Sequence, residues 1–218
     1  MNRLPTAHRN RVMLLLFLLF AVLASLLALK MGSSSISWQT LWQILRGEES
    51  GVLSTVVLDL RLPRVVTAFV AGGLLALSGL LMQILLRNPL ADPYVLGVSG
   101  GAAVAALLSL MAGLSAVWMA PAAFGGALLS MALVFGMTRM HGSWEPTRLL
   151  LTGVVIAAGW GAVITFLLAV SSDQALRGMV FWLMGDLGQP DLPGWELLLL
   201  LLGGAIALLM AREINVLT

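Results

Sequence analysis

Cysteine is absent from this 218-residue sequence, and histidine occurs only twice. Without cysteine the chain can form no disulfide, no thiolate metal site and no thiol nucleophile. His8 and His141 both lie outside the long apolar runs, so they predict neither an intramembrane metal site nor a proton relay. The phosphate-binding pattern G-x-x-x-x-G-K-[ST] does not occur, and Lys30 is the only lysine. We therefore expect no catalytic residue, no cofactor and no ATP hydrolysis by this chain itself.

Charge is also scarce. Charged residues make up 10% of the sequence and hydrophobic residues 60%, whereas soluble domains carry about 25% charged residues. Uncharged runs of about 20 residues predict membrane-spanning helices, because hydrocarbon cannot satisfy an open backbone, and they exclude the alternating strands of a barrel. The net charge is only +2, and the basic residues are scattered at the ends of these runs, so no nucleic-acid partner is expected. The expected fold class is all-α, a polytopic transmembrane helical bundle.

Charged and helix-breaking residues divide the sequence into about six spans of a single transmembrane domain, residues 1–218. Pro63 is expected to begin the second span, and a bend at Gly113–Pro121 to separate the third from the fourth. Ile36–Arg46 predicts a short interfacial helix, and Met179–Met184 a partly inserted helix that must pack on protein. The expected spans are Val12–Leu29, Val65–Leu86, Tyr94–Met111, Ala120–Thr138, Leu149–Ser172 and Trp195–Ala211.

The basic residues also predict an orientation. An even number of spans places both chain ends on one side, and the side with more arginine and lysine is the cytoplasm. The side of the chain ends carries Arg3, Arg9, Arg11, Arg87, Arg139, Arg148 and Arg212, and the opposite side Lys30, Arg46, Arg61, Arg64 and Arg177. We therefore expect both ends in the cytoplasm.

Two punctuated segments bracket the second expected span. Arg61-Leu-Pro-Arg64 precedes it, and Arg87-Asn-Pro-Leu-Ala-Asp-Pro-Tyr-Val-Leu-Gly97 follows it. With these segments the sequence resembles, over nearly its whole length, the BtuC/FecCD family of ABC importer permeases. The resemblance implies a permease subunit that moves an iron-siderophore or related iron chelate across the bacterial inner membrane. Haem and cobalamin are the alternative substrates.

The resemblance also implies partners. These are ABC ATPase subunits that hydrolyse the ATP, a periplasmic or lipid-anchored substrate-binding protein, a second permease copy or paralogue, and membrane lipid. Full-length relatives continue into coupling helices and further spans, so the chain resembles the N-terminal part of such a permease and is expected not to transport alone. Two other classes stay open, a non-transporting membrane scaffold and a secondary transporter. The second is weakened because the acidic residues lie in loops or at span ends.

Arg61 and Arg64 lie one helical turn apart at the outer start of the second span. A guanidinium group binds carboxylates through two parallel hydrogen bonds. The resemblance implies that arginines at this position meet acidic residues on the two lobes of the binding protein. Alternatively, both side chains only reach lipid phosphates and fix the depth of the span.

Further candidates lie inside the membrane and at its cytoplasmic face. Polar and small side chains in the spans either line the pathway or pack helices together, since they need partners or permit close contact. The resemblance implies a cytoplasmic gate at Pro146, Thr147 and Arg148, although Thr147 could instead cap the fifth span and Arg148 anchor it. The candidates for pathway or helix packing are Ser78, Met82, Gln83, Gly97, Ser99, Gly100 and Gly101.

Overall fold

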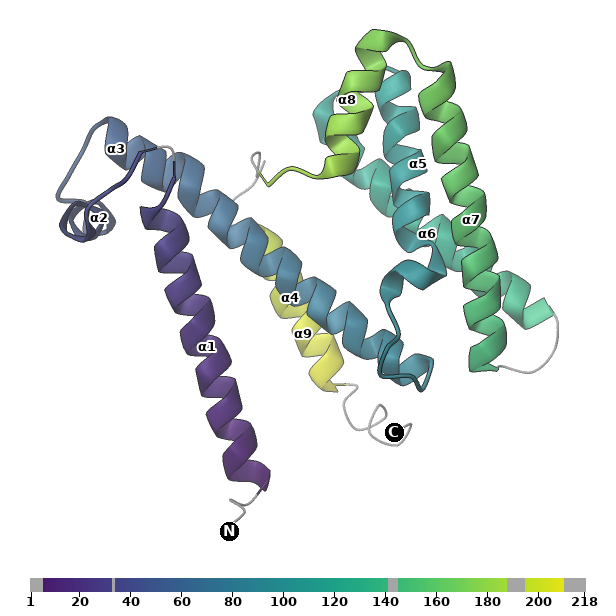
Figure 1. Cartoon of the computed structure of the whole chain (residues 1–218), viewed down its shortest axis with the longest axis horizontal. Coiled ribbons are helices and arrows are strands. Elements are labelled where there is room, and N and C mark those ends of the chain that lie inside the picture. The colour runs from purple at the N-terminus through teal and green to yellow at the C-terminus, as the bar shows by residue number, and fades with distance from the viewer. Residues whose placement is uncertain (1–5, 33, 141–144, 188–194, 210–218) are drawn as a thin grey trace. The chain divides into compact units, whose positions relative to one another are not determined.

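The computed structural model describes residues 6–32, 34–140, 145–187 and 195–209, and every regular element in these ranges is a helix. This confirms the all-α expectation (Figure 1). The elements are α1 (Thr6–Lys30), α2 (Trp38–Leu45), α3 (Val52–Thr55), η1 (Val56–Arg61), α4 (Leu62–Leu85), η2 (Pro93–Leu96), α5 (Val98–Met111), η3 (Ala116–Trp118), α6 (Met119–Met140), α7 (Pro146–Val170), α8 (Asp173–Met184) and α9 (Trp195–Leu209).

The chain divides into two compact units. The first comprises residues 1–72 and 187–199, and the second residues 73–186 and 200–218. The division falls within α4 after Gly72, and within α9 after Leu199. Each unit has its own buried contacts and is described by itself.

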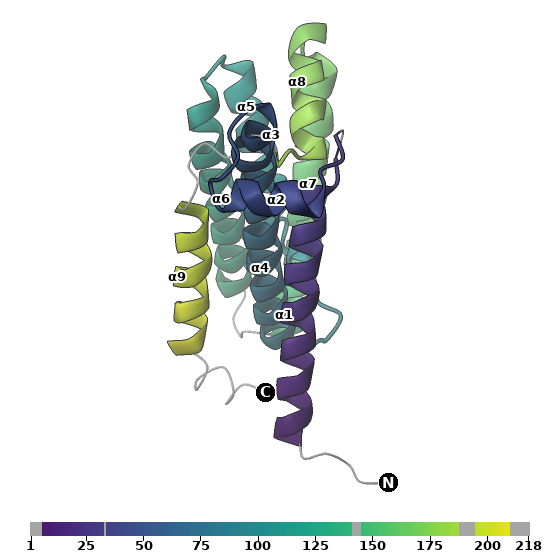
Figure 2. The ribbon, with the colours of Figure 1, turned by 90° about the vertical axis from the view of Figure 1, so that its left-hand side faces the viewer.

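The core of the first unit lies where the end of α1 meets α2 and η1. Leu29, Ile36, Leu41, Ile44 and Val57 form one buried cluster. Figure 2 shows α2 lying across the C-terminal end of α1. The hydroxyl of the residue before α2 accepts a hydrogen bond from the backbone of its first turn, which caps the helix. The short helix predicted within Ile36–Arg46 is therefore confirmed.

The second span begins earlier than predicted. The helical stretch runs without interruption from Val52 to Leu85, so Pro63 lies inside it and does not begin it. Proline has no N–H, and in an α-helix its ring collides with the carbonyl four residues back. Here the preceding turns are π-helical, and the N–H of Leu62 bonds to the carbonyl of Val57, five residues back. The wider turn accommodates the proline, so the start signal is misleading.

The second unit is built around α5. This helix contacts α6, α7 and α8, and its crossing with α6 is the closest of these because it joins two glycines. A methyl group on Gly101 would overlap the carbonyl of Gly126, and the reverse also holds. Close backbone contact of this kind replaces the hydrophobic effect as the force that holds helices together in lipid.

Among the residues that the structure describes, four helical stretches are long and apolar enough to cross a membrane: Arg9–Lys30, Val52–Leu85, Ala116–Met140 and Pro146–Val170. They confirm the first, second, fourth and fifth expected spans. The third, Tyr94–Met111, is broken. Its helical part, α5, has 14 residues, or about 21 Å at 1.5 Å per residue, and is shorter than the roughly 30 Å hydrocarbon core.

The remaining predictions are partly met. The bend between the third and fourth spans is confirmed, because Gly113 has a positive φ of 67° and ends α5. The sixth expected span begins with α9 at Trp195, and its last residues lie outside the described part of the chain. The short inserted helix is longer than expected, since α8 begins at Asp173. It packs on protein as predicted, through Met179 against Leu107 and Leu167.

Candidate functional site

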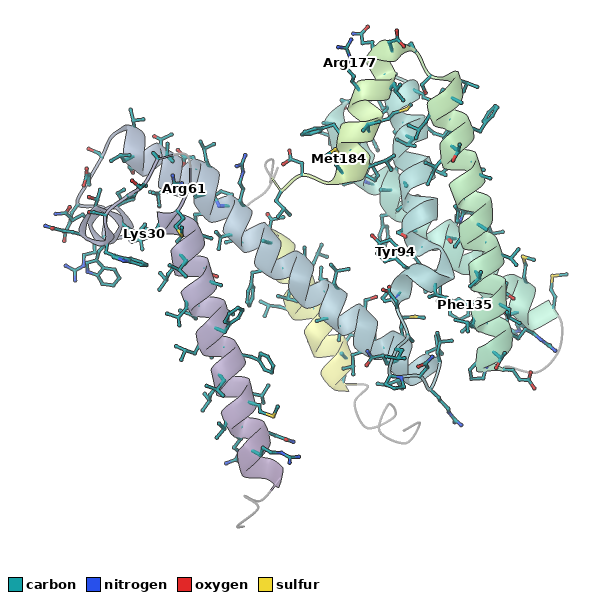
Figure 3. All side chains as sticks on the ribbon, viewed as in Figure 1. Lys30, Arg61, Tyr94, Phe135, Arg177 and Met184 are labelled. Carbon is teal, nitrogen blue, oxygen red and sulfur yellow. The ribbon has the colours of Figure 1, made fainter. Side chains whose placement is uncertain are left out.

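The side chain of Arg61 closes the C-terminal end of α1. Its Nη1 donates to the carbonyls of Leu29 at 2.8 Å and Lys30 at 3.1 Å, and its Nη2 to the carbonyl and the Oγ of Ser34 at 2.6 and 3.1 Å. Figure 3 labels Arg61 and Lys30 where they lie close together at this helix end. The last carbonyls of a helix have no intrahelical donor, so the guanidinium supplies the hydrogen-bond donors that the backbone lacks.

Gly32 leaves the space that this guanidinium occupies. A methyl group there would lie 2.7 Å from Nη2 and 2.9 Å from Cζ of Arg61. No local pattern in the sequence marks this glycine, because the group above it comes from a residue 29 positions later. The glycine and the arginine therefore form one structural feature.

Arg64, one turn further along, is exposed. Within the ranges that the structure describes, it makes no hydrogen bond or ion pair. Both arginines line a groove of about 600 Å³ between α1 and the η1–α4 stretch, whose α1 wall is made of small residues such as Ala24 and Ala28. The structure thus brings the two predicted docking residues to one place but gives them different surroundings.

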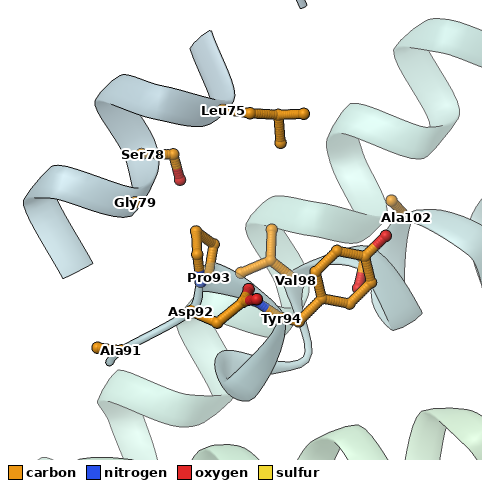
Figure 4. Close-up of a pocket in the computed structure, with 10 residues that line it drawn as sticks. Leu75, Ser78, Gly79, Ala91, Asp92, Pro93, Tyr94, Val98 and Ala102 are labelled. Atoms are coloured by element: carbon orange, nitrogen blue, oxygen red, sulfur yellow. The ribbon is translucent and has the colours of Figure 1, made fainter. Parts of the chain in front are cut away.

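A second cavity, of about 570 Å³, lies in the second unit between α4 and the broken third span. Figure 4 shows Leu75 and Ser78 of α4 facing Pro93, Tyr94 and Val98. The cavity brings together two of the candidate pathway residues, since Ser99 also lines it.

Asp92 shapes one edge of this cavity. Its Oδ1 accepts a hydrogen bond from the backbone N–H of Tyr94 at 2.8 Å, and Pro93 follows as the first helical residue. The carboxylate is thus engaged as a helix cap, as the Asp-Pro pair predicts.

The break in the third span lies at Gly97, whose φ is 66°. Its carbonyl accepts a hydrogen bond from Ser130 Oγ at 2.9 Å, and the carbonyl of Leu96 lies 3.4 Å from the same oxygen. Trp160 Nε1 donates to Ser130 Oγ at 3.0 Å. Ser130 is fully buried. Non-helical backbone within a membrane needs internal partners, and here the Gly97 carbonyl accepts from both this serine and the N–H of Gly101.

From the sequence, Ser130 is marked only as a helix-packing residue, because it lies four positions after Gly126 on one helix face. Its hydrogen bonds to the break were not predicted. Nothing local pointed to the indole donor of Trp160.

The glycines predicted for the pathway or for packing lie at helix contacts. A methyl group on Gly97 would lie 3.0 Å from the backbone nitrogen of Ala157, and one on Gly100 would lie 2.7 Å from Cβ of Trp160. With the Gly101 contact described above, three candidates thus sit where helices touch.

Met82 and Gln83, the two candidates near the end of α4, differ in burial. Met82 is 8% exposed and packs in a cluster with Leu86, Leu96 and Val134. The side chain of Gln83 is exposed. Met82 is therefore a packing residue, whereas Gln83 does not line the cavity beside Ser78.

The turn after α4 has an uncommon cap. Arg87 adopts a φ of 48°, and the N–H of Asn88 bonds to the carbonyl of Gln83 at 3.0 Å. Glycine usually occupies such a position. The Asn88 side chain then accepts a hydrogen bond from the N–H of Leu90 at 2.9 Å, which fixes the start of the next loop.

The gate candidates lie at the start of α7. Pro146 is the first residue of the helix and Glu145 precedes it as the N-cap, with no side-chain capping bond. Thr147 lies inside the helix, so the alternative that it caps the span is wrong: proline at the first position moves the start three residues earlier than predicted. Arg148 is half-buried. The loop before Glu145 lies outside the described residues.

Long apolar helices, a bundle held by glycine contacts and a broken span with satisfied carbonyls together define a multi-pass membrane protein. The model of the FecCD transport family matches residues 17–218. The chain belongs to this family.

Named relatives support the assignment. The chain is 40% identical to the hemin transport system permease protein HmuU of Yersinia pestis over 95% of its own length and 63% of the relative's. It is 37% identical to the ferric enterobactin transport system permease protein FepD of Escherichia coli over 91% of its length and 60% of the relative's. It is also 37% identical to the vitamin B12 import system permease protein BtuC of Pectobacterium atrosepticum, over 89% and 57%.

A solved structure agrees. It is an inward-facing conformation of a transporter assigned to the metal-chelate type of ABC transporter, with a TM-score of 0.79 and 26% identity. The match covers 95% of this chain and 65% of the other. The chain thus spans about three fifths of the relatives' length, and its helices and relatives place it in the inner membrane.

Proposed function

We propose that the chain is the transmembrane permease subunit of an ABC importer that moves an iron-siderophore or related iron chelate across the bacterial inner membrane. The observation that carries the proposal is the family match over residues 17–218, in which the four long apolar helices lie almost entirely. Haem and cobalamin are the alternative substrates, since relatives of similar identity are named for hemin, ferric enterobactin and vitamin B12.

In this proposal the chain does no chemistry of its own. Partner ATPase subunits hydrolyse ATP, and their closure shifts the permease pair between outward- and inward-facing populations. The cavity beside Ser78 and Ser99 contributes a wall of the path. Its volume of about 570 Å³ falls in the range of small-molecule sites, about 300–1,000 Å³. Pro146, Thr147 and Arg148 form the cytoplasmic gate.

The proposed orientation places both described ends of the chain toward the cytoplasm and the Arg61–Arg64 turn outside. Single cysteines test it without background, because the sequence has none. Ser35 and Glu145 are both exposed, so each can be replaced by cysteine with little effect on packing. In spheroplasts an impermeant maleimide should label position 35 at once and position 145 only after lysis. The opposite pattern would invert the topology.

Substrate transport is tested in a strain that lacks the native gene and its paralogues. Cells that carry the restored gene should accumulate one of three labelled compounds: a ferric siderophore, haemin or cobalamin. A ferric siderophore is the expected one. Uptake of haemin or cobalamin alone would select an alternative substrate, and uptake of none, with no docking of a binding protein, would favour a membrane scaffold.

A further inference from the structure

The two arginines of the Arg61-Leu-Pro-Arg64 motif have different surroundings although they share one turn. We propose that they divide the work: Arg61 is a positioning residue that holds the outer end of α1, and Arg64 alone makes the ion pair with the soluble binding protein. This inference rests on the docking part of the proposed function.

Almost all hydrogen-bond donors of Arg61 are used within the chain. Each Nη nitrogen of an arginine carries two hydrogens, and Nε carries one. The four hydrogen bonds to Leu29, Lys30 and Ser34 use both hydrogens on both Nη atoms of Arg61. Only Nε–H remains. Two parallel bonds to a carboxylate need at least one Nη–H, so Arg61 can bind a partner bidentately only by releasing α1.

The hydrogen bonds from Arg61 to Leu29, Lys30 and Ser34, here called the clamp, hold more than the end of α1. Ile36 is 3% exposed and packs beside Val57, and its N–H lies 3.4 Å from the Lys30 carbonyl that Arg61 also binds. The clamp therefore joins the end of α1, the turn that follows it and the helical stretch that carries Arg64. Lysine cannot replace it, because one ammonium cannot reach three residues as a planar fork does.

Arg64, in contrast, is available to a partner. Its side chain is exposed and, in the described part of the chain, its donors have no protein partner. The two lobes of a binding protein approach from outside, so a guanidinium with free Nη hydrogens is the one that can pair with a carboxylate at no cost to the fold.

The positioning role is tested first, with no partner protein. In the full chain in nanodiscs, Ile36→Cys reports a buried position of the clamp and Ser35→Cys its exposed neighbour. Adding Arg61→Lys should raise maleimide labelling at position 36 by about tenfold, since loss of well-placed charged hydrogen bonds makes local opening easier. Labelling at position 35 should not change. Arg64→Lys should change neither, and an unchanged rate at position 36 in Arg61→Lys overturns the clamp.

Gly32→Ala gives an independent test because it displaces the guanidinium without changing charge. It should reproduce the labelling of Arg61→Lys. The control is Gly72→Ala in the same unit, where an added methyl group meets nothing within 4 Å. Equal labelling in the two glycine variants would contradict the clamp.

The docking role is measured as the dissociation constant of each chelate-binding protein of the source organism, purified singly, over a range of salt concentrations. Arg64→Glu should weaken binding at least about thirtyfold and lower the salt dependence. Arg61→Gln should weaken binding but leave the salt dependence as in the wild type, whereas Arg64→Gln should lower it. Equal loss of salt dependence in Arg61→Gln and Arg64→Gln overturns the division of work. If Arg64→Glu binds normally, the proposed docking through this turn is wrong. The positioning role of Arg61 is then still tested by the labelling at position 36.

Discussion

The end of α1 and the break at Gly97 solve the same physical problem with different side chains. Each has backbone carbonyls at a helix boundary that accept from a side chain far away in the sequence, although the Gly97 carbonyl also accepts from the N–H of Gly101. At α1 the donor is the half-exposed guanidinium of Arg61, and at Gly97 it is the fully buried hydroxyl of Ser130. A charged donor is tolerable where water or lipid headgroups reach it, whereas a neutral hydroxyl avoids burying charge in the apolar interior. The choice of donor therefore reports the polarity of its surroundings.

The largest effect is expected where the backbones touch. Gly101→Val should clash with the carbonyl of Gly126 and separate α6 from the break at Gly97. We expect a loss of about 3 kcal/mol in the free energy of unfolding, as for strong overpacking. Gly125→Val, which meets nothing within 4 Å, is the matched control. Titration with SDS in mixed micelles measures the free energy of unfolding of both variants. Equal losses in Gly101→Val and Gly125→Val would show that the contact between Gly101 and Gly126 does not contribute to stability.

Removal of the buried donor should have the next effect. Ser130→Ala removes the hydroxyl at no steric cost. The Leu96 carbonyl then loses its donor and the indole N–H of Trp160 its acceptor, whereas the Gly97 carbonyl keeps the N–H of Gly101. The variant should lose about 2 kcal/mol in the same titration. Ser99→Ala, on the wall of the cavity, should change stability by less than about 0.5 kcal/mol. A neutral Ser130→Ala would mean that another donor satisfies the break.

The α1 end is expected to be more tolerant, because water can partly replace a half-exposed donor. Arg61→Lys should lose about 1 kcal/mol in the SDS titration. Arg61→Gln should be no more stable than Arg61→Lys, because glutamine keeps a planar amide but loses the charge and the length of the arginine side chain. Wild-type stability in Arg61→Lys would mean that charge alone suffices at this helix end.

The smallest effect on stability should come from Trp160, whose indole donates to the buried Ser130. Trp160→Phe removes the indole N–H that donates to Ser130 but keeps an aromatic ring against Gly100. We expect a loss of about 0.5–1 kcal/mol. A loss as large as that of Ser130→Ala would mean that the indole, and not the serine, governs the break.

Local signals in the sequence predicted local structure well. The bend at Gly113 follows from the positive φ that glycine adopts easily, and the short helix within Ile36–Arg46 from its helical spacing. Apolar runs correctly predicted four of the six expected spans for the same reason, since length and composition are local properties. The predicted start at Pro63 was wrong because a π-helical turn before a proline has no strong sequence signature.

The long-range contacts could not be predicted. Arg61 meets a carbonyl 32 residues earlier, and Ser130 meets one 33 residues earlier. Spacing along one helix cannot reveal a partner on another. The motif identified the turn that holds Arg61 and Arg64, but only the structure separates an engaged arginine from an available one.

The energy source of uptake tests the importer proposal most directly. Cells that express the native gene are given the labelled ferric siderophore, once with a partner ATPase that cannot hydrolyse ATP and once with an uncoupler that leaves ATP intact. We predict that uptake is lost with the inactive ATPase and persists with the uncoupler. Uptake that persists with the inactive ATPase and is lost with the uncoupler would contradict the ABC importer and establish a secondary transporter.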